Sequence, residues 1–328
     1  MSDRDASADG VRRAAERLKG KALVTPLIEN ETLNARVGGR VLMKAETLQH
    51  TGSFKFRGAY NLLSQLGPEQ RKRGVLAWSS GNHAQGVALA ARLLGMPAII
   101  VMPTDAPAVK AERVRGYGAE IVPYDRYTDD REAIGRRLAE ERAMTLAPSY
   151  DHPDIIEGQG TLALEAVRQA AGMGATFDAF IACCGGGGMS AGCALVLEEL
   201  APAAELWIAE PEGFDETWAS IRDGVRHRAD VTRPTICDAL ASPAPGALTL
   251  PILARLARGG ASLTEDEVRA AMAYAFKYLK LVVEPGGAVA LAAILAGKVN
   301  AKGRTLGLTL SGGNVDASLY AQILARFA

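Results

Sequence analysis

Short apolar runs alternate with longer amphipathic segments along most of this chain. A run of five or six mostly apolar residues, such as 98–102 or 305–310, is typical of a strand that is buried on both faces. The longer segments carry apolar residues at intervals of three and four, which predicts helices. Because the two kinds of segment alternate, the pattern indicates an α/β fold with parallel sheets covered by helices.

The bounds of the expected elements follow from the same pattern. Strands are predicted at residues 41–45, 74–78, 98–102, 119–124, 144–147, 179–183, 206–209, 281–283 and 305–310. Helices are predicted at residues 11–18, 60–66, 84–94, 106–117, 130–142, 160–171, 189–200, 264–278, 287–295 and 316–327. Residues 1–10 are expected to be loose. Residues 223–251 show little periodicity and are expected to form loops and short elements.

The composition is that of a globular protein with balanced charge. The 328 residues suggest about two domains, and 48% of them are hydrophobic, which is enough to bury a core. The 37 basic and 37 acidic residues give no net field that would attract nucleic acid or an anionic membrane. We therefore expect a small neutral or zwitterionic ligand and no nucleic-acid partner.

The sequence also argues against a membrane or secreted protein. The first twenty residues contain no apolar core, and the longest apolar run, residues 288–296, is too short to span a bilayer. Cys183, Cys184, Cys193 and Cys237 form neither a CxxC motif nor a disulfide framework. We expect a reduced, cytoplasmic protein.

A lysine loop and three glycine-rich loops carry the candidate chemistry. Lys55 follows the strand predicted at 41–45 and opens a helix. A lone loop lysine is most often a solvated charge. Here, however, loops at 79–83, 185–188 and 311–314 also follow apolar runs and precede helices. The loops would then lie at the carboxyl edge of the sheet, where open α/β folds bind ligands. We therefore expect them to converge on Lys55.

The four glycines at 185–188 predict a phosphate site. A tight turn needs one or two glycines, whereas four in a row allow a ligand to approach the backbone. The run precedes a predicted helix, whose N-terminal N–H groups and dipole favour an anion. No Walker lysine follows and the spacing is not GxGxxG, which disfavours a nucleotide. Taken singly, the loops at 79–83 and 311–314 would be ordinary helix caps.

In combination, these motifs resemble the fold type II pyridoxal-phosphate enzymes, specifically the serine/threonine dehydratase and serine racemase group. The matching motifs span nearly the whole chain: Thr25-Pro26-Leu27, residues 51–59 and 79–83, Asp151-His152-Pro153, Gly158-Gln159-Gly160-Thr161, residues 185–188 and Ser311-Gly312-Gly313-Asn314. The resemblance implies a tryptophan synthase β-like fold, with two domains that each hold an open, mostly parallel twisted sheet covered by helices. Residues 1–55 and 148–328 would form the large cofactor-binding domain, and residues 56–147 a small mobile domain inserted in it. It also implies a homodimer.

The resemblance further implies a role for each loop residue. Lys55 matches the lysine that binds pyridoxal 5′-phosphate covalently and takes the α-proton of the substrate, and partial burial would favour its neutral form. The implied cofactor-binding residues are Phe54, Lys55, Asn82, Gly185, Gly186, Gly187, Gly188, Met189, Glu284 and Ser311. The implied substrate-binding residues are Ser79, Ser80, Asn82 and His83, and the implied catalytic residues are Lys55 and Ser80.

Two serines bear on the type of reaction. Ser311 matches the hydroxyl that faces the pyridine nitrogen, and a neutral partner leaves the ring a weaker electron sink, which suits β-elimination better than transamination. At the position of Ser80, serine racemases and some hydroxyaspartate dehydratases carry serine, whereas biosynthetic threonine deaminases commonly carry alanine. A hydroxyl opposite Lys55 would act as a second acid or base for racemisation; alternatively, Ser80 only caps the helix or binds the substrate carboxylate.

Residues 210–216 resemble the segment that binds a divalent cation in this family. Glu210, the carbonyl of Phe214 and Glu216 fall at the ligand positions, and oxygen ligands suit Mg²⁺, Ca²⁺ or Mn²⁺. Glu216 replaces the more usual aspartate, which lengthens the reach of the carboxylate. The alternative is a solvated loop without a metal.

Other positions bear on substrate choice. The chain has Cys237-Asp238-Ala239 where relatives often read Ala-Asp-Gly, and Gly286-Gly287-Ala288 where many read Thr-Ala-Gly. Both segments lie near the ring and the substrate in the family, so we expect a different side-chain pocket. Arg131 aligns roughly with an arginine implicated in carboxylate binding, although an arginine next to Asp130 is more often a solvated helix start.

We therefore predict a pyridoxal-phosphate-dependent dehydratase, or ammonia-lyase, that converts a β-hydroxy amino acid such as threonine or serine to a 2-oxo acid and ammonia. Within the family the alternative is a 3-hydroxyaspartate dehydratase or a serine racemase. An alternative from another class is a non-catalytic ligand sensor that keeps the glycine loops.

Overall fold

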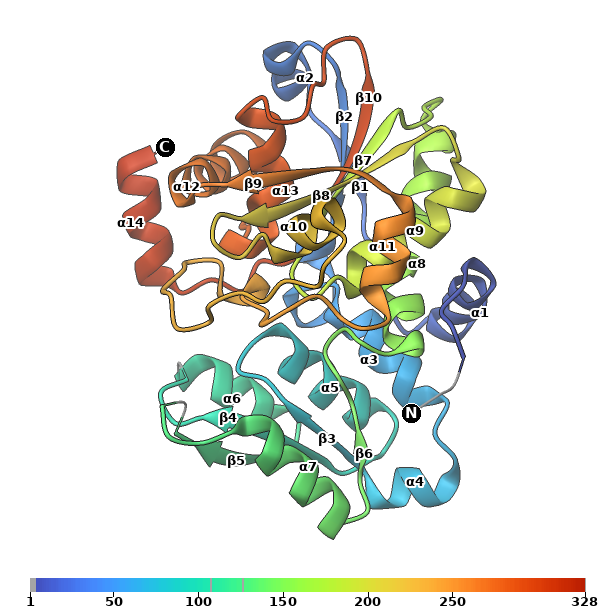
Figure 1. Cartoon of the computed structure of the whole chain (residues 1–328), viewed down its shortest axis with the longest axis vertical. Coiled ribbons are helices and arrows are strands. Elements are labelled where there is room, and N and C mark those ends of the chain that lie inside the picture. The colour runs from blue at the N-terminus through green and yellow to red at the C-terminus, as the bar shows by residue number, and fades with distance from the viewer. Residues whose placement is uncertain (1–3, 107, 126, 328) are drawn as a thin grey trace.

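Two mostly parallel sheets lie one above the other in Figure 1, a computed structural model that describes residues 4–106, 108–125 and 127–327. The larger sheet has the strand order β1 (Leu27–Glu29), β2 (Arg40–Ala45), β10 (Thr305–Leu310), β7 (Ala179–Cys183), β8 (Glu205–Pro211), β9 (Ala257–Leu263). The smaller has the order β5 (Glu120–Tyr124), β4 (Ala98–Pro103), β3 (Val75–Trp78), β6 (Thr145–Leu146). Neighbouring strands are parallel except β1 and β2. The predicted fold class is confirmed.

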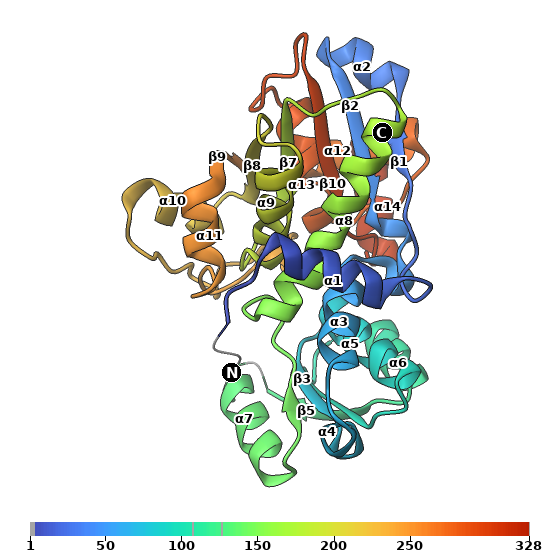
Figure 2. The ribbon, with the colours of Figure 1, turned by 90° about the vertical axis from the view of Figure 1, so that its right-hand side faces the viewer.

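Helices cover both sheets, as Figure 2 shows from the side. In chain order they are α1 (Ala8–Leu18), α2 (Glu31–Val37), α3 (Lys55–Ser64), α4 (Pro68–Arg73), α5 (Asn82–Leu93), α6 (Ala108–Gly116), α7 (Arg131–Glu141), α8 (Pro153–Gly172), α9 (Gly188–Leu200), α10 (Glu216–Asp223), α11 (Thr249–Leu256), α12 (Glu265–Tyr274), α13 (Pro285–Leu295) and α14 (Ala317–Phe327). Four short elements join them: η1 (Glu46–Leu48), η2 (His50–Gly52) and η3 (Asp238–Leu240) are 3₁₀ turns, and η4 (Ala275–Leu279) is a π-helix.

Local sequence explains where several helices begin. The side chains of Ser7, Asn30 and Asp130 each accept a hydrogen bond from the first turn of the helix that follows, which satisfies a free N–H group. Thr264 and Glu267 form a reciprocal capping box at the start of α12. In the part of the chain that the structure describes, no helix is both long and apolar enough to cross a bilayer.

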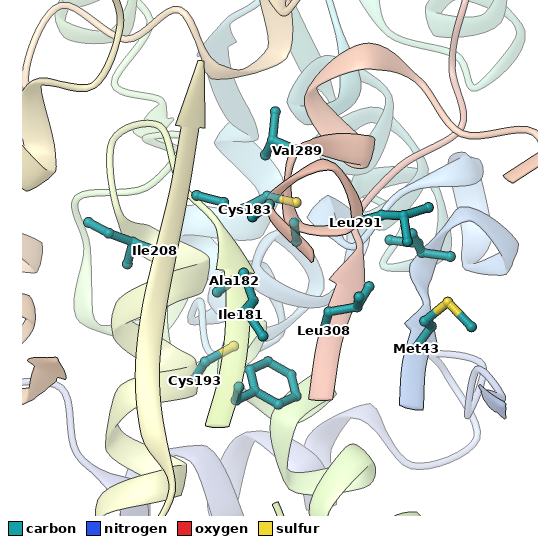
Figure 3. Close-up of a cluster of buried hydrophobic side chains, with 14 of the residues drawn as sticks. Met43, Ile181, Ala182, Cys183, Cys193, Ile208, Val289, Leu291 and Leu308 are labelled. Atoms are coloured by element: carbon teal, nitrogen blue, oxygen red, sulfur yellow. The ribbon is translucent and has the colours of Figure 1, made fainter. Parts of the chain in front are cut away.

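The core of the larger sheet lies between its central strands and helices α9 and α13. Figure 3 shows Met43 of β2, Leu308 of β10, Ile181 of β7 and Ile208 of β8 beside Val289 of α13, and all five side chains are fully buried. Full burial of a side chain of this size contributes about 1.5–3 kcal/mol. Strands β7 and β10 are therefore anchored in the core, and two of the glycine-rich loops continue from their ends.

The smaller sheet is buried on both faces by alternating residues. Val75, Ala77 and Ile100 join the apolar cluster under α3 and α5, whereas Leu76 and Ile99 join a second cluster under α7. Successive side chains of a strand point to opposite faces, so continuous apolar runs are needed where helices cover both. The continuous apolar runs in the sequence therefore correspond to strands that helices cover on both faces.

Most predicted elements are present, and β7 and β10 match the predicted bounds residue for residue. The strand predicted at 281–283 is wrong, because Lys280 adopts a left-handed conformation (φ 59°) and Pro285 begins α13 shortly afterwards. Residues 1–10 were expected to be loose, and this prediction is wrong from Ala8 onward because α1 begins there. Residues 1–3 and residue 107, within the helix predicted at 106–117, lie outside the described residues. The elements that the sequence did not predict are β1, β9, α2, α4, α10 and α11.

Candidate active site between the two sheets

A cleft of about 1080 Å³ lies between the two sheets, and the predicted loops line it. The loops follow the carboxyl ends of β3, β7 and β10, and they contribute Ser79 to His83, Gly185 to Gly188 and Ser311. Lys55 reaches the same cleft from the start of α3. The structure therefore brings together the residues that the sequence singled out, at the edge where parallel sheets bind ligands.

Lys55 is held at the junction of the two sheets. Its Nζ donates to the carbonyl of Ser149 at 2.9 Å and lies 5.2 Å from the centre of the Phe54 ring. The backbone before it is anchored, since the N–H of Phe54 donates to the carbonyl of Ser311. Burial lowers the pKa of Lys55 to about 8, although the nearby Glu284 opposes the shift. The amine is therefore poised to lose its proton near neutral pH.

A buried network of charges fixes the helix that carries Lys55. The guanidinium of Arg57, fully buried, donates to Glu46 at 2.8 Å with Nε and Nη2, and to Glu165 at 2.7 and 2.8 Å with Nη1 and Nη2. Lys44 of β2 also donates to Glu165, at 2.6 Å. Although burial favours the neutral acid, Arg57 holds the pKa of Glu46 below its ordinary value. We name Lys44, Glu46, Arg57 and Glu165 the ionic cluster. It joins β2, α3 and α8, and its Arg57 lies two residues beyond Lys55.

Asn82 is oriented by Glu284, which precedes α13, and by Asn314, in the loop after β10. Its Nδ2 donates to Glu284 at 2.6 Å, and its Oδ1 accepts a hydrogen bond from Asn314 at 2.7 Å. Asn314 in turn accepts a hydrogen bond from Arg113 of α6 at 2.8 Å. Burial and Asp238 raise the pKa of Glu284 to about 8. Residues on both sides of the cleft therefore fix the direction in which the Asn82 amide presents its donors.

The other residues of the loop that follows β3 differ in their bonding. His83 contacts the carbonyl of Ala147 through Nε2 at 2.8 Å, and burial lowers its pKa to about 3, so it stays neutral. The hydroxyl of Ser79 accepts a hydrogen bond from the N–H of Gly81 at 3.2 Å. Ser80 also lines the cleft, and its hydroxyl has no hydrogen-bond partner among the described residues. A helix-capping role for Ser80 finds no support.

Close neighbours or backbone conformation require glycine at all four positions of the loop after β7. A Cβ on Gly186 would lie 2.5 Å from the ring of Tyr150, and one on Gly188 would lie 2.9 Å from the same residue. A Cβ on Gly185 would lie 2.9 Å from the carbonyl of Leu240. Gly187 has a positive φ of 89° and is the residue before α9. The N–H groups at the start of α9 have no intrahelical acceptor and border the cleft, which suits a phosphate group.

Ser311 and Met189 complete the ligand-facing surface. Ser311 is buried directly after β10 and borders the cleft opposite the small sheet. Met189, in the first turn of α9, is buried and borders the cleft beside the glycines. An amine, a row of backbone N–H groups and a neutral hydroxyl thus surround one cavity. These groups fit a phosphorylated ring that carries a carbonyl carbon, because they supply a nucleophile and an anion site together.

The predicted cation segment contains two buried carboxyl groups. Glu210 accepts hydrogen bonds from the backbone N–H groups of Thr217 and Trp218 at the start of α10. Both oxygens of Glu216 are buried without a hydrogen-bond partner among the described residues, and burial raises its pKa to about 7. Phe214 is buried beside them. Within the described residues, no group of three or more His, Cys, Asp or Glu side chains could hold a metal.

Arg131, which the sequence related to carboxylate binding, begins α7 and borders the cleft. Two other cleft residues carried no signal in the sequence. Tyr150 packs on the glycine loop and donates to the carbonyl of Ala244 at 3.4 Å. Arg226 borders the cleft from the loop after α10, which the sequence showed only as an aperiodic segment. Contacts of this kind depend on distant segments meeting, so local pattern could not reveal them.

Comparison with known proteins identifies what the chain is similar to. The family model described as "Pyridoxal-phosphate dependent enzyme" matches residues 19–312. An L-threo-3-hydroxyaspartate ammonia-lyase from Pseudomonas sp is 47% identical, over 96% of this chain and 97% of that protein. A serine racemase from Schizosaccharomyces pombe is 40% identical, over 97% of each chain. The crystal structure of a T.th. threonine deaminase superposes with a TM-score of 0.89 at 40% identity, covering 94% of this chain and 99% of that one.

Proposed function

The chain belongs to the family of pyridoxal-phosphate-dependent enzymes, and we propose that it is an ammonia-lyase that converts a small β-hydroxy amino acid to a 2-oxo acid and ammonia. The observation that carries this proposal is the partly buried amine of Lys55, which shares one cleft with the glycine loop and Ser311. The relatives named above are enzymes, which disfavours a non-catalytic sensor. Threonine, serine and 3-hydroxyaspartate are the candidate substrates.

Residues around the cleft would hold the cofactor. Lys55 would bind its carbonyl carbon, and the N–H groups from Gly185 to Met189 would bind its phosphate. Asn82 would offer an amide donor to the cofactor, and Ser311 a neutral hydroxyl. Phe54 lies next to the amine, and Glu284 holds Asn82 in place.

The bound cofactor supplies an electron-accepting ring that stabilises negative charge at the substrate Cα. Lys55, whose pKa is lowered by burial, removes the proton from Cα as its neutral amine. The backbone N–H groups at the start of α5, after Ser79 and Ser80, bind the substrate carboxylate. Burial lowers the pKa of His83 to about 3, so its neutral ring is too weak a base to compete for that proton. Ser311 cannot protonate a ring nitrogen, which favours loss of the β-hydroxyl over transamination.

One observation favours a racemase side activity. The hydroxyl of Ser80 is free of protein partners among the described residues and borders the cleft. A hydroxyl that is not engaged in a cap is available to deliver a proton to the face of Cα opposite Lys55. We propose that Ser80 is this second acid or base.

The buried carboxyl groups of Glu210 and Glu216 support a cation proposal. Two unpaired buried oxygens on Glu216 are costly unless the group is protonated or bound to a cation. The carbonyl of Phe214 would be a third ligand, and oxygen donors suit Mg²⁺, Ca²⁺ or Mn²⁺. Removal of a bound cation by a chelator tests this site.

We also propose that the protein is a cytoplasmic homodimer in which residues 56–147 form a small mobile domain and residues 1–55 with 148–328 a large one. The sheets support this division, since all four strands of the smaller sheet fall within 56–147. Exposed apolar side chains support the dimer, and they come from two segments that a hydrogen bond from Asn30 to the carbonyl of Tyr278 joins: Leu23, Val24, Leu48, Phe276, Tyr278 and Val282. Analytical ultracentrifugation will test the oligomeric state.

A substrate panel tests the proposed function. The purified enzyme with pyridoxal phosphate should release a 2-oxo acid from at least one of L-serine, L-threonine and L-threo-3-hydroxyaspartate. Lys55→Ala should lose turnover and the cofactor absorbance band that borohydride abolishes, with an unchanged circular dichroism spectrum. Full activity in that variant, or a wild type inert toward the whole panel, would refute the proposal.

A further inference from the structure

The glycine loop at 185–188 is fixed by its carbonyl groups and keeps its donors free. Among the described residues, the N–H groups of Gly185, Gly186 and Gly187 donate to no protein acceptor. The carbonyl of Gly186 accepts hydrogen bonds from the hydroxyl of Thr249 at 2.7 Å and from the N–H of Gly246 at 3.1 Å. Neither of these two donors borders the cleft, so the carbonyl points away from it. The N–H of Gly187 belongs to the same planar peptide group and therefore points the opposite way.

The ring of Tyr150 packs flat against this loop. A Cβ on Gly186 would lie 2.5 Å from each of three ring atoms, Cγ, Cδ2 and Cε2, so it would stand over the face of the ring. A Cβ on Gly188 would lie 2.9 Å from both Cα and Cβ of the same tyrosine. For each glycine the three nearest atoms all belong to Tyr150. One side chain therefore determines how far the loop can move in that direction.

The residues on either side of Tyr150 are anchored as well. The carbonyl of Ser149 accepts the hydrogen bond from the amine of Lys55 at 2.9 Å. The carboxylate of Asp151 accepts hydrogen bonds from two N–H groups in the turn before α11, both at 2.8 Å. That turn begins next to Gly246, which binds the glycine loop. Three consecutive residues thus contact the amine, the glycine loop and the turn that supports the loop.

The hydroxyl of Tyr150 adds little to this arrangement. It donates to the carbonyl of Ala244 at 3.4 Å, which is long for a hydrogen bond between two oxygens. Burial raises the pKa of Tyr150, so the hydroxyl stays protonated at neutral pH. The flat ring, and not the polar group, is the part that meets the loop.

We propose that Tyr150 is a positioning residue that holds the glycine loop at a fixed separation from Lys55, so that one cofactor molecule reaches the phosphate site and the amine together. This inference rests on the cofactor of the proposed function and not on the choice of substrate. Pyridoxal phosphate carries its carbonyl carbon and its phosphate arm on one rigid ring, so its two anchors must keep one separation. A loop that is already held in place loses less freedom on binding.

Two ligands that differ only in the phosphate test this role. The cofactor-free protein is titrated with pyridoxal phosphate and with pyridoxal, which has the carbonyl carbon but no phosphate. In Tyr150→Ala, the affinity for pyridoxal phosphate should fall about 10- to 100-fold and that for pyridoxal less than about threefold, because only the phosphate uses the loop. Tyr150→Phe keeps the ring and should recover most of the loss. Tyr127→Ala is the matched control, since Tyr127 is 85% exposed and does not border the cleft.

A double-mutant cycle tests the contact itself. Gly186→Ala places a methyl group against the ring and should weaken binding of pyridoxal phosphate about tenfold in the wild type. In Tyr150→Ala the ring is absent, so the same methyl group should cause little further loss. Circular dichroism checks that each variant folds. If Tyr150→Ala does not fold, Tyr150→Leu takes its place, because leucine keeps apolar volume without a flat ring.

Three results would overturn the proposal. Equal losses for pyridoxal phosphate and pyridoxal in Tyr150→Ala would mean that Tyr150 only stabilises the fold. A Tyr150→Phe variant as weak as Tyr150→Ala would show that the hydroxyl, and not the ring, is required. Independent losses from Gly186→Ala and Tyr150→Ala would show that the ring does not position the loop. A wild type that binds no pyridoxal phosphate would refute the proposed function and this inference with it.

Discussion

Replacement of Arg57 by methionine should destabilise the protein far more than replacement of an exposed arginine. The guanidinium makes four hydrogen bonds of 2.7 to 2.8 Å to Glu46 and Glu165, and both it and Glu46 are fully buried. Removing one partner of a buried ion pair leaves the other charge without compensation, which costs about 3–5 kcal/mol. That is a large share of a total stability of about 5–15 kcal/mol.

The loss should also depend on pH. In the wild type the pKa of Glu46 is below its ordinary value of 4.5, so its stabilisation is present above pH 4.5 and is lost as the pH falls through the folded value. Without Arg57, burial dominates and raises this pKa above 4.5. The carboxyl group then stabilises the folded state only while protonated, and that contribution is lost as the pH rises. The difference between wild type and Arg57→Met should therefore be larger at pH 8 than at pH 5.

Urea unfolding followed by circular dichroism at both pH values measures these differences. Arg137→Met is the matched control: its exposed pair with Glu141, at 3.4 Å, should contribute less than about 1 kcal/mol at either pH. Arg57→Lys should recover part of the stability, because an ammonium keeps the charge but not the forked geometry. If Arg57→Met unfolds at the same urea concentration as Arg137→Met, the ionic cluster does not stabilise the junction and the reasoning fails.

Three further outcomes are expected. In the cofactor-free protein, labelling of Lys55 by an amine reagent should rise with a midpoint near pH 8, since its pKa is lowered from 10.5, and mass spectrometry showing a midpoint near 10.5 would contradict the argument. Ser80→Ala should reduce racemisation about 10²-fold while L-substrate dehydration, measured in parallel, falls much less; equal losses would assign Ser80 to general positioning. Chelator should lower the melting temperature of the wild type but not of Glu216→Gln, because a cation that binds only the folded state stabilises it, and identical curves with an empty metal analysis would remove the site.

The sequence predicted the sheet strands that are continuous and apolar, and it failed where packing reversed the local signal. Strand β9 contains Gly259 and Gly260, which are unfavourable in a strand, and pattern alone did not reveal it. In the structure a Cβ on these glycines would lie 2.5 Å from the Trp207 ring and 2.2 Å from the Trp218 ring. The glycines are therefore needed to receive two indoles. Only the folded neighbours explain them.

The candidate site likewise contains residues that the sequence predicted and residues that it did not. Lys55, the glycine loop and Ser311 each follow a predictable strand, so their convergence could be expected from topology. Tyr150 and Arg226 reach the cleft from a short crossing segment and an aperiodic loop, and their contacts are with carbonyl groups of residues 244 and 245. No spacing rule relates such positions. The sequence consequently could not predict the shape of the cleft near Tyr150 and Arg226.

The location of Lys55 at the junction of the sheets has a mechanical consequence. The chain enters the smaller sheet's layer through α3, which Lys55 begins, and leaves it past Ser149, whose carbonyl accepts the hydrogen bond from the lysine amine. Both crossings thus meet at one atom pair. In any swinging motion of the smaller sheet about these crossings, points on the pivot move least. The Lys55 nitrogen would therefore move little relative to the glycine loop, even while the cleft opened and closed to exchange substrate and product.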